Sequence, residues 1–413
     1  MARILVVGGS LGGLMAANLL LRAGHDVQVL ERSGRSLEGR GAGIVTHDTL
    51  RQALREAGAV VDAGLGVAVR SRVALGVDGE VVGRWDYPQV LTSWGRLYTL
   101  LRDALPTDRY RLGAQVVQVT QSDDHVDAEL ATGTRLHADL LIAADGVRSG
   151  VRAQLAPAVT PVYAGYVAWR GVCDEASLSR RTRETLFPHF GFGLPEREQL
   201  IGYPVAGSNN RLGLGERAWN FVWYRPAAQG TELAALLTDA DGVHHPEGIA
   251  PQQVSWRQIA AMRQAARERL APQFAEIVEK TAQPFVQPIV DLVSPQLAFG
   301  RIALLGDAAM VARPHVGMGV TKAGDDARAL AACIAEFGAT PAALARYAAL
   351  RQPIGAAVVE RGRQLGAYLQ ARSRTSSEPV AERSVEAVLR QTAVDPLLFG
   401  HAFESPAPHA SAA

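Results

Sequence analysis

The amino-acid sequence predicts an α/β protein in which a Rossmann-type dinucleotide-binding domain is joined to a second domain built on a mixed sheet. Near the N-terminus, a short apolar strand runs directly into a glycine-rich turn and a helix, the order that dinucleotide binding requires. Two later apolar runs, residues 140–144 and 302–305, each end in a turn that pairs glycine with aspartate. The long segment between them is rich in aromatic residues and alternates as strands do.

The composition excludes several classes of partner. A chain of 413 residues suits two closely built domains, and a formal net charge of +1 gives no broad basic surface for nucleic acid or an anionic membrane. The N-terminus has no signal-peptide pattern, and the apolar run at 14–21 is too short to span a bilayer. We therefore expect a cytoplasmic protein without nucleic-acid or membrane partners. A homodimer is left open.

The cysteines and the paired histidines indicate no metal centre. Cys173 and Cys333 lie in apolar runs without a pairing or ligand pattern, so we expect two buried thiols. His244 and His245 are adjacent in a loop, but no acid or cysteine accompanies them at metal-ligand spacing. The sequence therefore predicts no metal site.

The first βαβ unit is the clearest local pattern. Residues 4–7 read as a buried parallel strand, and the helix after the glycine-rich turn is expected to extend to about Ala23. Gly24 then stands at a C-cap position, and residues 27–30 form the next strand. This strand–turn–helix–strand order favours nucleotide binding over an ordinary glycine-rich turn.

The turn itself has the residues that a pyrophosphate requires. Gly8 allows the tight turn, and Gly13 allows the helix to pack closely on the strand. The helix N-terminus offers N–H groups to phosphates. Ser10 replaces the usual middle glycine, but it is small and can donate a hydrogen bond. Glu31 follows Gly8 by 23 residues and can accept hydrogen bonds from a ribose diol.

The second and third motifs also follow short strands. After residues 140–144 come Asp145, Ser149 and Arg152, which we expect to hold a phosphate or ribose group; the alternative is an ordinary Asp–Gly turn. After residues 302–305 comes Asp307. Farther on, glycines precede a helix expected to begin near residue 321, which would leave backbone N–H groups facing a bound ring.

In this order and spacing, the three motifs resemble the FAD-binding framework of the single-component (class A) flavoprotein aromatic hydroxylases. The resemblance implies a fold like that of para-hydroxybenzoate hydroxylase, with FAD as cofactor and NADH or NADPH as co-substrate. It assigns residues 1–152 and 289–370 to a discontinuous FAD-binding domain and 153–288 to a substrate-binding antiparallel-sheet domain. Residues 371–413 are then a C-terminal helix and a flexible tail.

The same resemblance identifies the cofactor-binding residues. Asp307 is expected to bond the ribityl chain, and Arg96 either approaches the FAD phosphates or is a solvated cation on a helix face. Met310 and Met318 stand where histidine and glutamine are frequent in the family. The complete predicted set is Gly8, Ser10, Leu11, Gly13, Glu31, Arg32, Arg96, Val116, Asp145, Arg152, Asp307, Pro314, Gly317, Met318, Gly319 and Val320.

The middle region is expected to form the sheet that covers the flavin ring, with aromatic side chains that stack on a flat substrate. Two of its local sequences, at 163–171 and 221–224, together with 313–315 after the third motif, look most like the branch of the family that includes 2,6-dihydroxypyridine 3-hydroxylase. The expected strands are 163–171, 190–194, 200–205 and 219–224, and the expected helices are 231–238 and 256–269.

The resemblance implies a monooxygenase that transfers oxygen from a flavin C4a-hydroperoxide to a hydroxylated aromatic, expected to be a nitrogen heterocycle of the hydroxypyridine kind. Its partners are then the small aromatic substrate and O2. A general base would activate the ring, and His47, Tyr203 and His315 are the candidates. Two alternatives remain open: urate-type or polyketide-ring hydroxylation on the same scaffold, and a non-catalytic flavin-binding protein.

Overall fold

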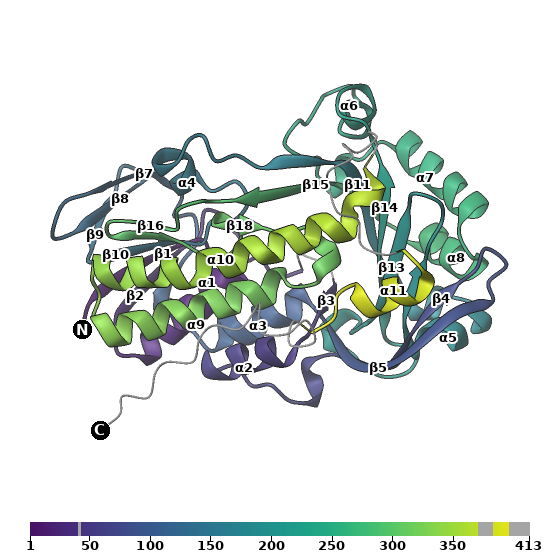
Figure 1. Cartoon of the computed structure of the whole chain (residues 1–413), viewed down its shortest axis with the longest axis horizontal. Coiled ribbons are helices and arrows are strands. Elements are labelled where there is room, and N and C mark those ends of the chain that lie inside the picture. Colours follow the sequence, from purple (N-terminus) through teal and green to yellow (C-terminus); the bar gives the residue numbers. More distant parts are fainter. Residues whose placement is uncertain (40–42, 371–382, 396–413) are drawn as a thin grey trace.

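The computed structural model describes residues 1–39, 43–370 and 383–395. One large sheet lies toward each end of the long axis, and long helices lie beside the first sheet (Figure 1). Among the described residues, no helix is long and apolar enough to cross a membrane.

The first sheet forms the predicted nucleotide-binding core. Its strands are parallel except for the short outermost strand β16, and the central strands are buried along nearly their whole length, as parallel strands covered on both faces are. All four apolar runs predicted as strands belong to it. The order is β16 (Ala298–Phe299), β17 (Ile302–Leu304), β10 (Leu140–Ala143), β1 (Arg3–Val7), β2 (Asp26–Leu30) and β6 (Tyr110–Arg111).

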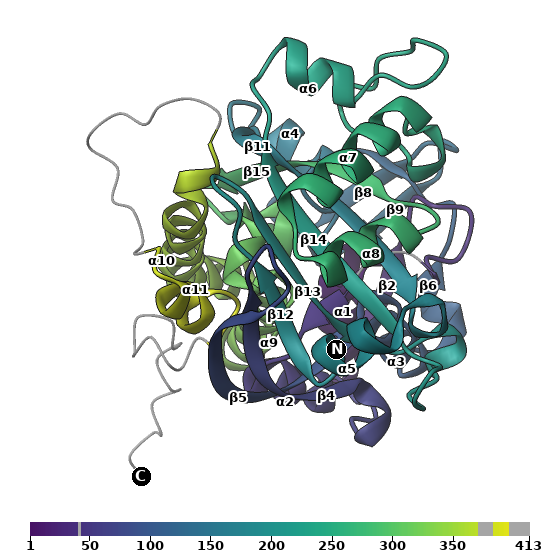
Figure 2. The same ribbon diagram turned by 90° about the vertical axis from the view of Figure 1, so that its right-hand side faces the viewer.

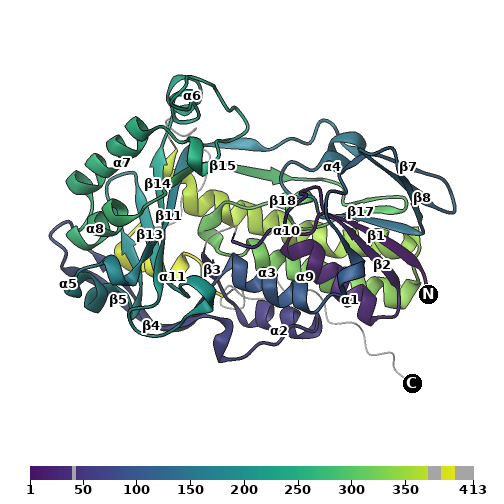
Figure 3. The same cartoon turned by 180° about the vertical axis from the view of Figure 1, so that it is seen from behind.

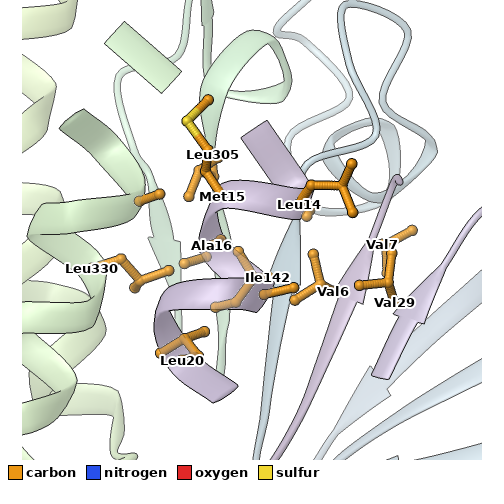
Figure 4. Packing of buried hydrophobic residues seen from close by; sticks show 14 of the residues in the cluster. Val6, Val7, Leu14, Met15, Ala16, Leu20, Val29, Ile142, Leu305 and Leu330 are labelled. Carbon is orange, nitrogen blue, oxygen red and sulfur yellow. The ribbon is translucent and has the colours of Figure 1, made fainter. Parts of the chain in front are cut away.

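Helices α1 (Leu11–Arg22), α9 (Gly319–Phe337) and α10 (Pro341–Gly366) pack together beside this sheet. Figure 4 shows side chains of α1, with Val6 of the sheet on one side and Leu330 of α9 on the other. In the view from behind, β1, β2 and α3 (Trp94–Asp103) lie nearer the viewer than α10 does (Figure 3). Helices α3 and α10 therefore lie on opposite sides of the molecule. Helix α9 begins at Gly319, two residues before the predicted start.

A small antiparallel sheet extends the first domain outward. It consists of β7 (Val116–Gln121), β8 (Val126–Leu130) and β9 (Arg135–Ala138), followed by helix α4 (Gly150–Leu155) after β10. Buried residues of the small sheet, including Val126 and Ala128, belong to the same apolar core as β1 and α1.

The second sheet is mixed, as predicted, because one pair of neighbours, β12 and β4, is parallel while the others are antiparallel. The strands expected in the middle region are all present. The order is β18 (Met310–Val311), β15 (Phe285–Val293), β11 (Val162–Asp174), β14 (Ala218–Pro226), β13 (Gln199–Val205), β12 (His189–Gly193), β4 (Val67–Leu75), β5 (Val81–Ser93) and β3 (Gly43–Val45).

The membership of this sheet differs from the expected division of the chain. Strands β3, β4 and β5 fall within 1–152, which we assigned to the FAD-binding domain, yet they pair with the second sheet. Strand β15 also crosses the expected boundary at 288/289. The reason is that backbone hydrogen bonds to β12 satisfy one side of β4, a long-range pairing that neighbouring residues do not specify.

Helices cover one face of the second sheet and leave the other toward the molecular interior. Helices α7 (Trp256–Arg269) and α8 (Pro272–Lys280) lie in front of β13 and β14 in Figure 2, and α5 (Arg180–Leu186) packs beside α8. Trp169 and Trp223 point into this apolar layer. Side chains one position away along the strands therefore face the interior.

The remaining elements connect these layers. Both cysteines are buried free thiols, as expected. A helix, α11 (Val385–Gln391), lies within the predicted C-terminal segment 371–413, and residues 371–382 and 396–413 of that segment, which include the predicted flexible tail, lie outside the described residues. The other helices are α2 (Asp48–Glu56), α6 (Thr231–Leu236) and the 3-10 turns at Ala63–Leu65, Thr107–Arg109, Glu175–Ser177, Ser208–Asn210, Pro251–Gln253, Gly306–Ala308, Pro314–Val316 and Ala367–Leu369.

Candidate functional site

A cavity of about 380 Å³ lies between the two large sheets. One side is lined by residues 10–12 at the start of α1, 146–147 after β10 and 305–307 after β17. Side chains of β11, β13 and β14 line the opposite side. Three motifs that are distant in sequence therefore meet around one cavity. A wider hollow of about 650 Å³ lies elsewhere, near Glu175 and Arg217, and its described lining includes none of the motifs.

The first motif forms a tight turn that opens the N-terminus of α1 toward the cavity. Gly8 has φ +105°, and a Cβ on Gly13 would lie 1.9 Å from the carbonyl oxygen of Gly8. The Glu31 carboxylate accepts a hydrogen bond from the backbone N–H of Gly9 at 2.9 Å. Glu31 therefore fixes the turn, and its remaining lone pairs are those that a ribose diol would use.

In the second motif, Arg152 does not have the role that the sequence predicted. All three guanidinium nitrogens donate to carbonyl oxygens, including those of Val147 at 2.6 Å and Ala308 at 2.9 Å. Arg152 is buried, so it ties the second motif to the third instead of contacting a phosphate. Asp145 accepts from the N–H of Val151, and its Oδ1 is buried with no partner in the described part of the chain. Burial raises the pKa of Asp145.

The third motif presents Asp307 to the cavity. Gly306 has φ +62°, which lets the chain turn sharply after β17. The Asp307 side chain is accessible from the cavity, and its enclosure by protein raises its pKa, although Lys322 acts in the opposite direction. Asp307 is therefore positioned to accept hydrogen bonds from hydroxyl groups of a ligand.

A buried ion network supports this turn. Lys322 donates to the carbonyl oxygen of Gly306 at 3.0 Å and to Asp326 at 3.1 Å, and Arg351 of α10 donates to the other Asp326 oxygen at 2.8 Å. Asp326 also accepts from the N–H of Gly306. Burial alone would raise the pKa of Asp326, but Lys322 and Arg351 hold it below its ordinary value. The network fixes the start of the third motif.

The loop between β18 and α9 completes this side of the cavity. Pro314, Gly317, Gly319 and Val320 line it, and Gly317 adopts the left-handed conformation at φ +66°. The first turn of α9 therefore borders the cavity, and its N–H groups favour negative charge there. Met318 is buried and lies outside the described lining.

The second sheet provides a polar patch within a largely apolar surface. Arg170, Tyr203 and Tyr224 face the cavity, with Ile201 and Val222 between them. Arg170 Nε and the Tyr224 hydroxyl are buried, and neither has a hydrogen-bond partner among the described residues. Burial raises the pKa of Tyr224 to about 12 despite the nearby Arg170, and it raises that of Tyr203 further. Both tyrosines are therefore neutral hydrogen-bond donors.

Of the three residues predicted as a general base, only Tyr203 is in the described lining of the cavity. His47 is buried, its Nδ1 lies 2.8 Å from the Thr321 hydroxyl, and burial lowers its pKa to about 4. His315 uses both ring nitrogens, with Gln199 at 3.1 Å and the Tyr166 hydroxyl at 2.9 Å. Burial lowers its pKa to about 3.

The predicted base role of His315 is therefore corrected, because a ring with both nitrogens engaged inside the protein has no free atom to take a substrate proton. His47 likewise fastens the segment before α2 to α9 at Thr321. Arg96 Nε donates to the carbonyl oxygen of Gly64 at 3.1 Å, and Arg96 lies outside the described cavity lining. Arg32 and Val116 lie outside the described cavity lining.

Three features of the site were missed in the sequence analysis. Arg170 is a single cation within a largely apolar strand, and this pattern could have indicated a functional side chain. Lys322 is one of two lysines in the chain and lies four residues before Asp326, a helical pairing distance. Ala393 also lines the cavity and donates its N–H to the carbonyl oxygen of His315, a contact from the chain end that no local pattern predicts.

The polar groups around the cavity fit FAD. A helix N-terminus stands beside the first turn, Asp307 faces the cavity, and buried Asp145 Oδ1 and Arg170 Nε have no partner in the described structure. Comparison with known families agrees. Residues 163–291 match the family described as FAD binding domain-like, and residues 11–36 match flavin containing amine oxidoreductases.

The fold and this cavity define a flavin-dependent oxidoreductase, and the chain belongs to the FAD-dependent aromatic monooxygenases, which use NADH or NADPH as co-substrate. It is 35% identical to 2,6-dihydroxypyridine 3-monooxygenase of Paenarthrobacter nicotinovorans, over 80% of this chain and 82% of that protein. It is 31% identical to the aurachin C monooxygenase/isomerase of Stigmatella aurantiaca, over 84% of each chain.

A solved structure gives the same result in three dimensions. The 2,6-dihydroxypyridine-3-hydroxylase of Arthrobacter nicotinovorans superposes with a TM-score of 0.84 at 31% identity, over 93% of this chain and 99% of that one. The predicted family, its α/β fold and its cofactor are therefore confirmed.

Proposed function

We propose that the enzyme hydroxylates a hydroxypyridine-like nitrogen heterocycle, with NADH or NADPH and O2 as co-substrates. The observation that carries the proposal is the side chain of Arg170, which faces the cavity with Nε buried and without a partner among the described residues. A buried, unpaired donor of a guanidinium calls for an anionic or strongly polar ligand atom. The names of the relative and the structural neighbour that act on 2,6-dihydroxypyridine point to the same substrate class.

The three motifs would hold FAD along one side of the cavity. Asp307 would accept hydrogen bonds from the ribityl hydroxyls, and the N-terminus of α1 would face the pyrophosphate. Bound FAD supplies the hydride acceptance and oxygen activation that no side chain provides. The residues proposed to surround it are Gly8, Ser10, Leu11, Gly13, Glu31, Arg32, Val116, Asp145, Asp307, Pro314, Gly317, Met318, Gly319 and Val320.

The second sheet would prepare the substrate. Arg170 would lower the pKa of a ring hydroxyl by pairing with the oxyanion, and deprotonation makes a ring carbon a better nucleophile. Neutral Tyr203 and Tyr224 would donate hydrogen bonds to polar atoms of the ring. Apolar neighbours such as Ile201 and Val222 would keep water from the reacting face. The substrate would therefore bind as an anion, without a histidine acting as base.

Substrate-dependent turnover tests the proposal. The FAD-reconstituted protein is mixed with NADH or NADPH and with hydroxypyridines, simple phenols or urate, and the products are analysed after reaction under ¹⁸O2. We expect hydroxypyridines to stimulate reduced-nicotinamide oxidation most and to gain one ¹⁸O atom. Urate or a phenol as the preferred oxygenated substrate would overturn the substrate class. Oxidation that yields peroxide with no hydroxylated product from any ring would overturn the hydroxylase function.

Replacing the cavity cation tests the anion-binding role. Arg170→Met should raise the KM for the hydroxypyridine by about 10- to 100-fold, the loss expected for a charged hydrogen bond. It should also shift the pH optimum upward, because the substrate must then ionise unaided. Arg170→Lys should recover part of the affinity, and Arg84→Met, at an exposed position of strand β5, is the control. An unchanged KM and pH profile in Arg170→Met would contradict the role.

A further inference from the structure

Three side chains on the small sheet direct potential ligand atoms toward one another. Asp127 on β8 and His137 on β9 are cross-strand partners, and His125 lies in the turn that precedes β8. Their ligand atoms all lie within 4.8 Å of one another. Figure 1 places this sheet at the opposite end of the molecule from the second sheet, so the cluster is separate from the flavin cavity.

The nitrogen–oxygen distances are those of neighbouring ligands on one metal ion. His137 Nδ1 lies 3.1 Å from Asp127 Oδ1, and His125 Nε2 lies 3.5 Å from Asp127 Oδ2. Zn²⁺ binds histidine nitrogen and carboxylate oxygen at about 2.0–2.1 Å, which separates neighbouring ligand atoms by about 3.3 Å. Both separations are close to this value, and the two histidines face different oxygens of the Asp127 carboxylate.

The hydrogen bonding of His125 adds an independent argument. Its Nδ1 lies 2.7 Å from Asp124 Oδ1, a contact that requires a proton on Nδ1. This contact orients the ring so that Nε2 faces the Asp127 carboxylate at 3.5 Å. A cation between Nε2 and the carboxylate would be bound by both. A histidine whose other nitrogen donates to a carboxylate is also the usual arrangement around bound zinc.

We propose that His125, Asp127 and His137 form a binding site for a divalent transition metal of the zinc type, with Asp124 orienting His125. Two imidazole ligands favour such an ion over Mg²⁺ or Ca²⁺, which prefer oxygen. Because the His137 side is exposed, water completes the coordination. The metal would fasten the turn after β7 to β9. The sequence predicts no metal here because strand pairing, and not sequence spacing, assembles the ligands.

Metal titration of the FAD-loaded, chelator-treated enzyme tests the site. We expect one Zn²⁺ per chain by calorimetry, and Co²⁺ should give the visible absorption of a tetrahedral ion. His137→Ala and Asp127→Asn should abolish this binding, and Asp124→Asn should weaken it about tenfold or more. His245→Ala is the matched control, because it removes a histidine that pairs with Asp239 at 2.8 Å elsewhere.

The outcomes separate a metal site from an ion-pair cluster. All variants are compared at equal FAD content and equal Tm in the presence of chelator, so that misfolding is not read as lost binding. Binding that survives in both His137→Ala and Asp127→Asn, or that disappears in His245→Ala, would overturn the proposal. So would wild-type protein that binds less than one Zn²⁺ per chain, because the cluster would then be held by contacts among its own side chains alone.

Discussion

Gly13 shows how the absence of one side chain sets the geometry of the cofactor turn. The Cβ of any other residue would lie 1.9 Å from the Gly8 carbonyl oxygen, and backbone cannot yield as a side-chain end can. Gly8 itself has φ +105° and faces the backbone of Ala144 and Asp145. The close contact of α1 with β1 and the shape of the first turn therefore depend on the same residue.

We predict that Gly13→Val will lose FAD and will lower the free energy of unfolding by about 3 kcal/mol, the upper range for overpacking a close contact. The measurement is FAD content after reconstitution together with chemical unfolding. Gly150→Ala is the matched control, since a Cβ there meets no atom within 4 Å. A Gly13→Val protein with full FAD content would contradict the assigned geometry.

His315 makes stability depend on pH. Burial lowers its pKa from the ordinary 6.5 to about 3, so the unfolded chain takes up a proton at a pH where the folded chain does not. The resulting stabilisation is complete above pH 6.5 and is lost as the pH falls toward 3. The loss is about 1.4 kcal/mol for each pH unit within this window.

Unfolding measured between pH 7 and pH 4 tests this. His315→Gln keeps a polar side chain but cannot titrate, so its free energy of unfolding should fall less steeply with acid than that of the wild type. His244→Gln, at an exposed position, should keep the wild-type slope. Equal slopes in His315→Gln and wild type would show that His315 titrates normally in the folded protein.

At the scale of elements, α9 and α10 support the third motif through buried charge. Lys322 and Asp326 lie one turn apart on α9, and Arg351 reaches Asp326 from α10. Each charge is compensated by hydrogen bonds inside the protein, and removing one member leaves its partner buried and poorly paired. The network therefore couples the packing of two helices to the position of Gly306.

Lys322→Met should accordingly lower the free energy of unfolding by about 3 kcal/mol and weaken FAD retention. Lys280→Met is a close control, because Lys280 is the other lysine of the chain and lies exposed at the end of α8. Urea unfolding and the dissociation constant of FAD report the two effects. Retention of both wild-type values in Lys322→Met would rule out a supporting role for the network.

Elements with strong local patterns could be predicted, and those fixed by distant partners could not. The buried strands at 4–7, 140–144 and 302–305 were recognisable because parallel strands covered on both faces are continuously apolar. The location of β3 to β5 in the second sheet depends on pairing with β12, more than 90 residues away, which composition does not encode. The predicted phosphate-binding role of Arg152 was wrong for a similar reason. Its guanidinium donates to the carbonyl oxygens of residues 147, 159 and 308, and the last of these is distant in the sequence.

At the scale of the whole molecule, residues near the end of the described chain contribute to the cavity. Arg72 of β4 is fully buried and donates to the carbonyl oxygens of Leu389 at 2.8 Å and Ala393 at 2.6 Å. Ala393 in turn lines the cavity. The Arg72 guanidinium thus links α11 and the residues that follow it to the second sheet.

Arg72→Met should release this segment, because several buried carbonyl groups lose their donor at once. We expect faster hydrogen–deuterium exchange across 385–393 and a higher KM, with the first sheet unaffected. Arg70→Met, two residues earlier on the exposed face of the same strand, should behave as wild type. Unchanged exchange across 385–393 would show that other contacts hold the segment.

Three distant motifs form one FAD site in this enzyme, and the amount of FAD bound per chain tests this most directly. Protein reconstituted with excess FAD and freed of unbound flavin should carry one FAD per chain, whereas Asp307→Ala should retain much less under the same treatment. A wild-type protein that stays colourless after reconstitution, or an Asp307→Ala variant with full occupancy, would show that the motifs do not form this site.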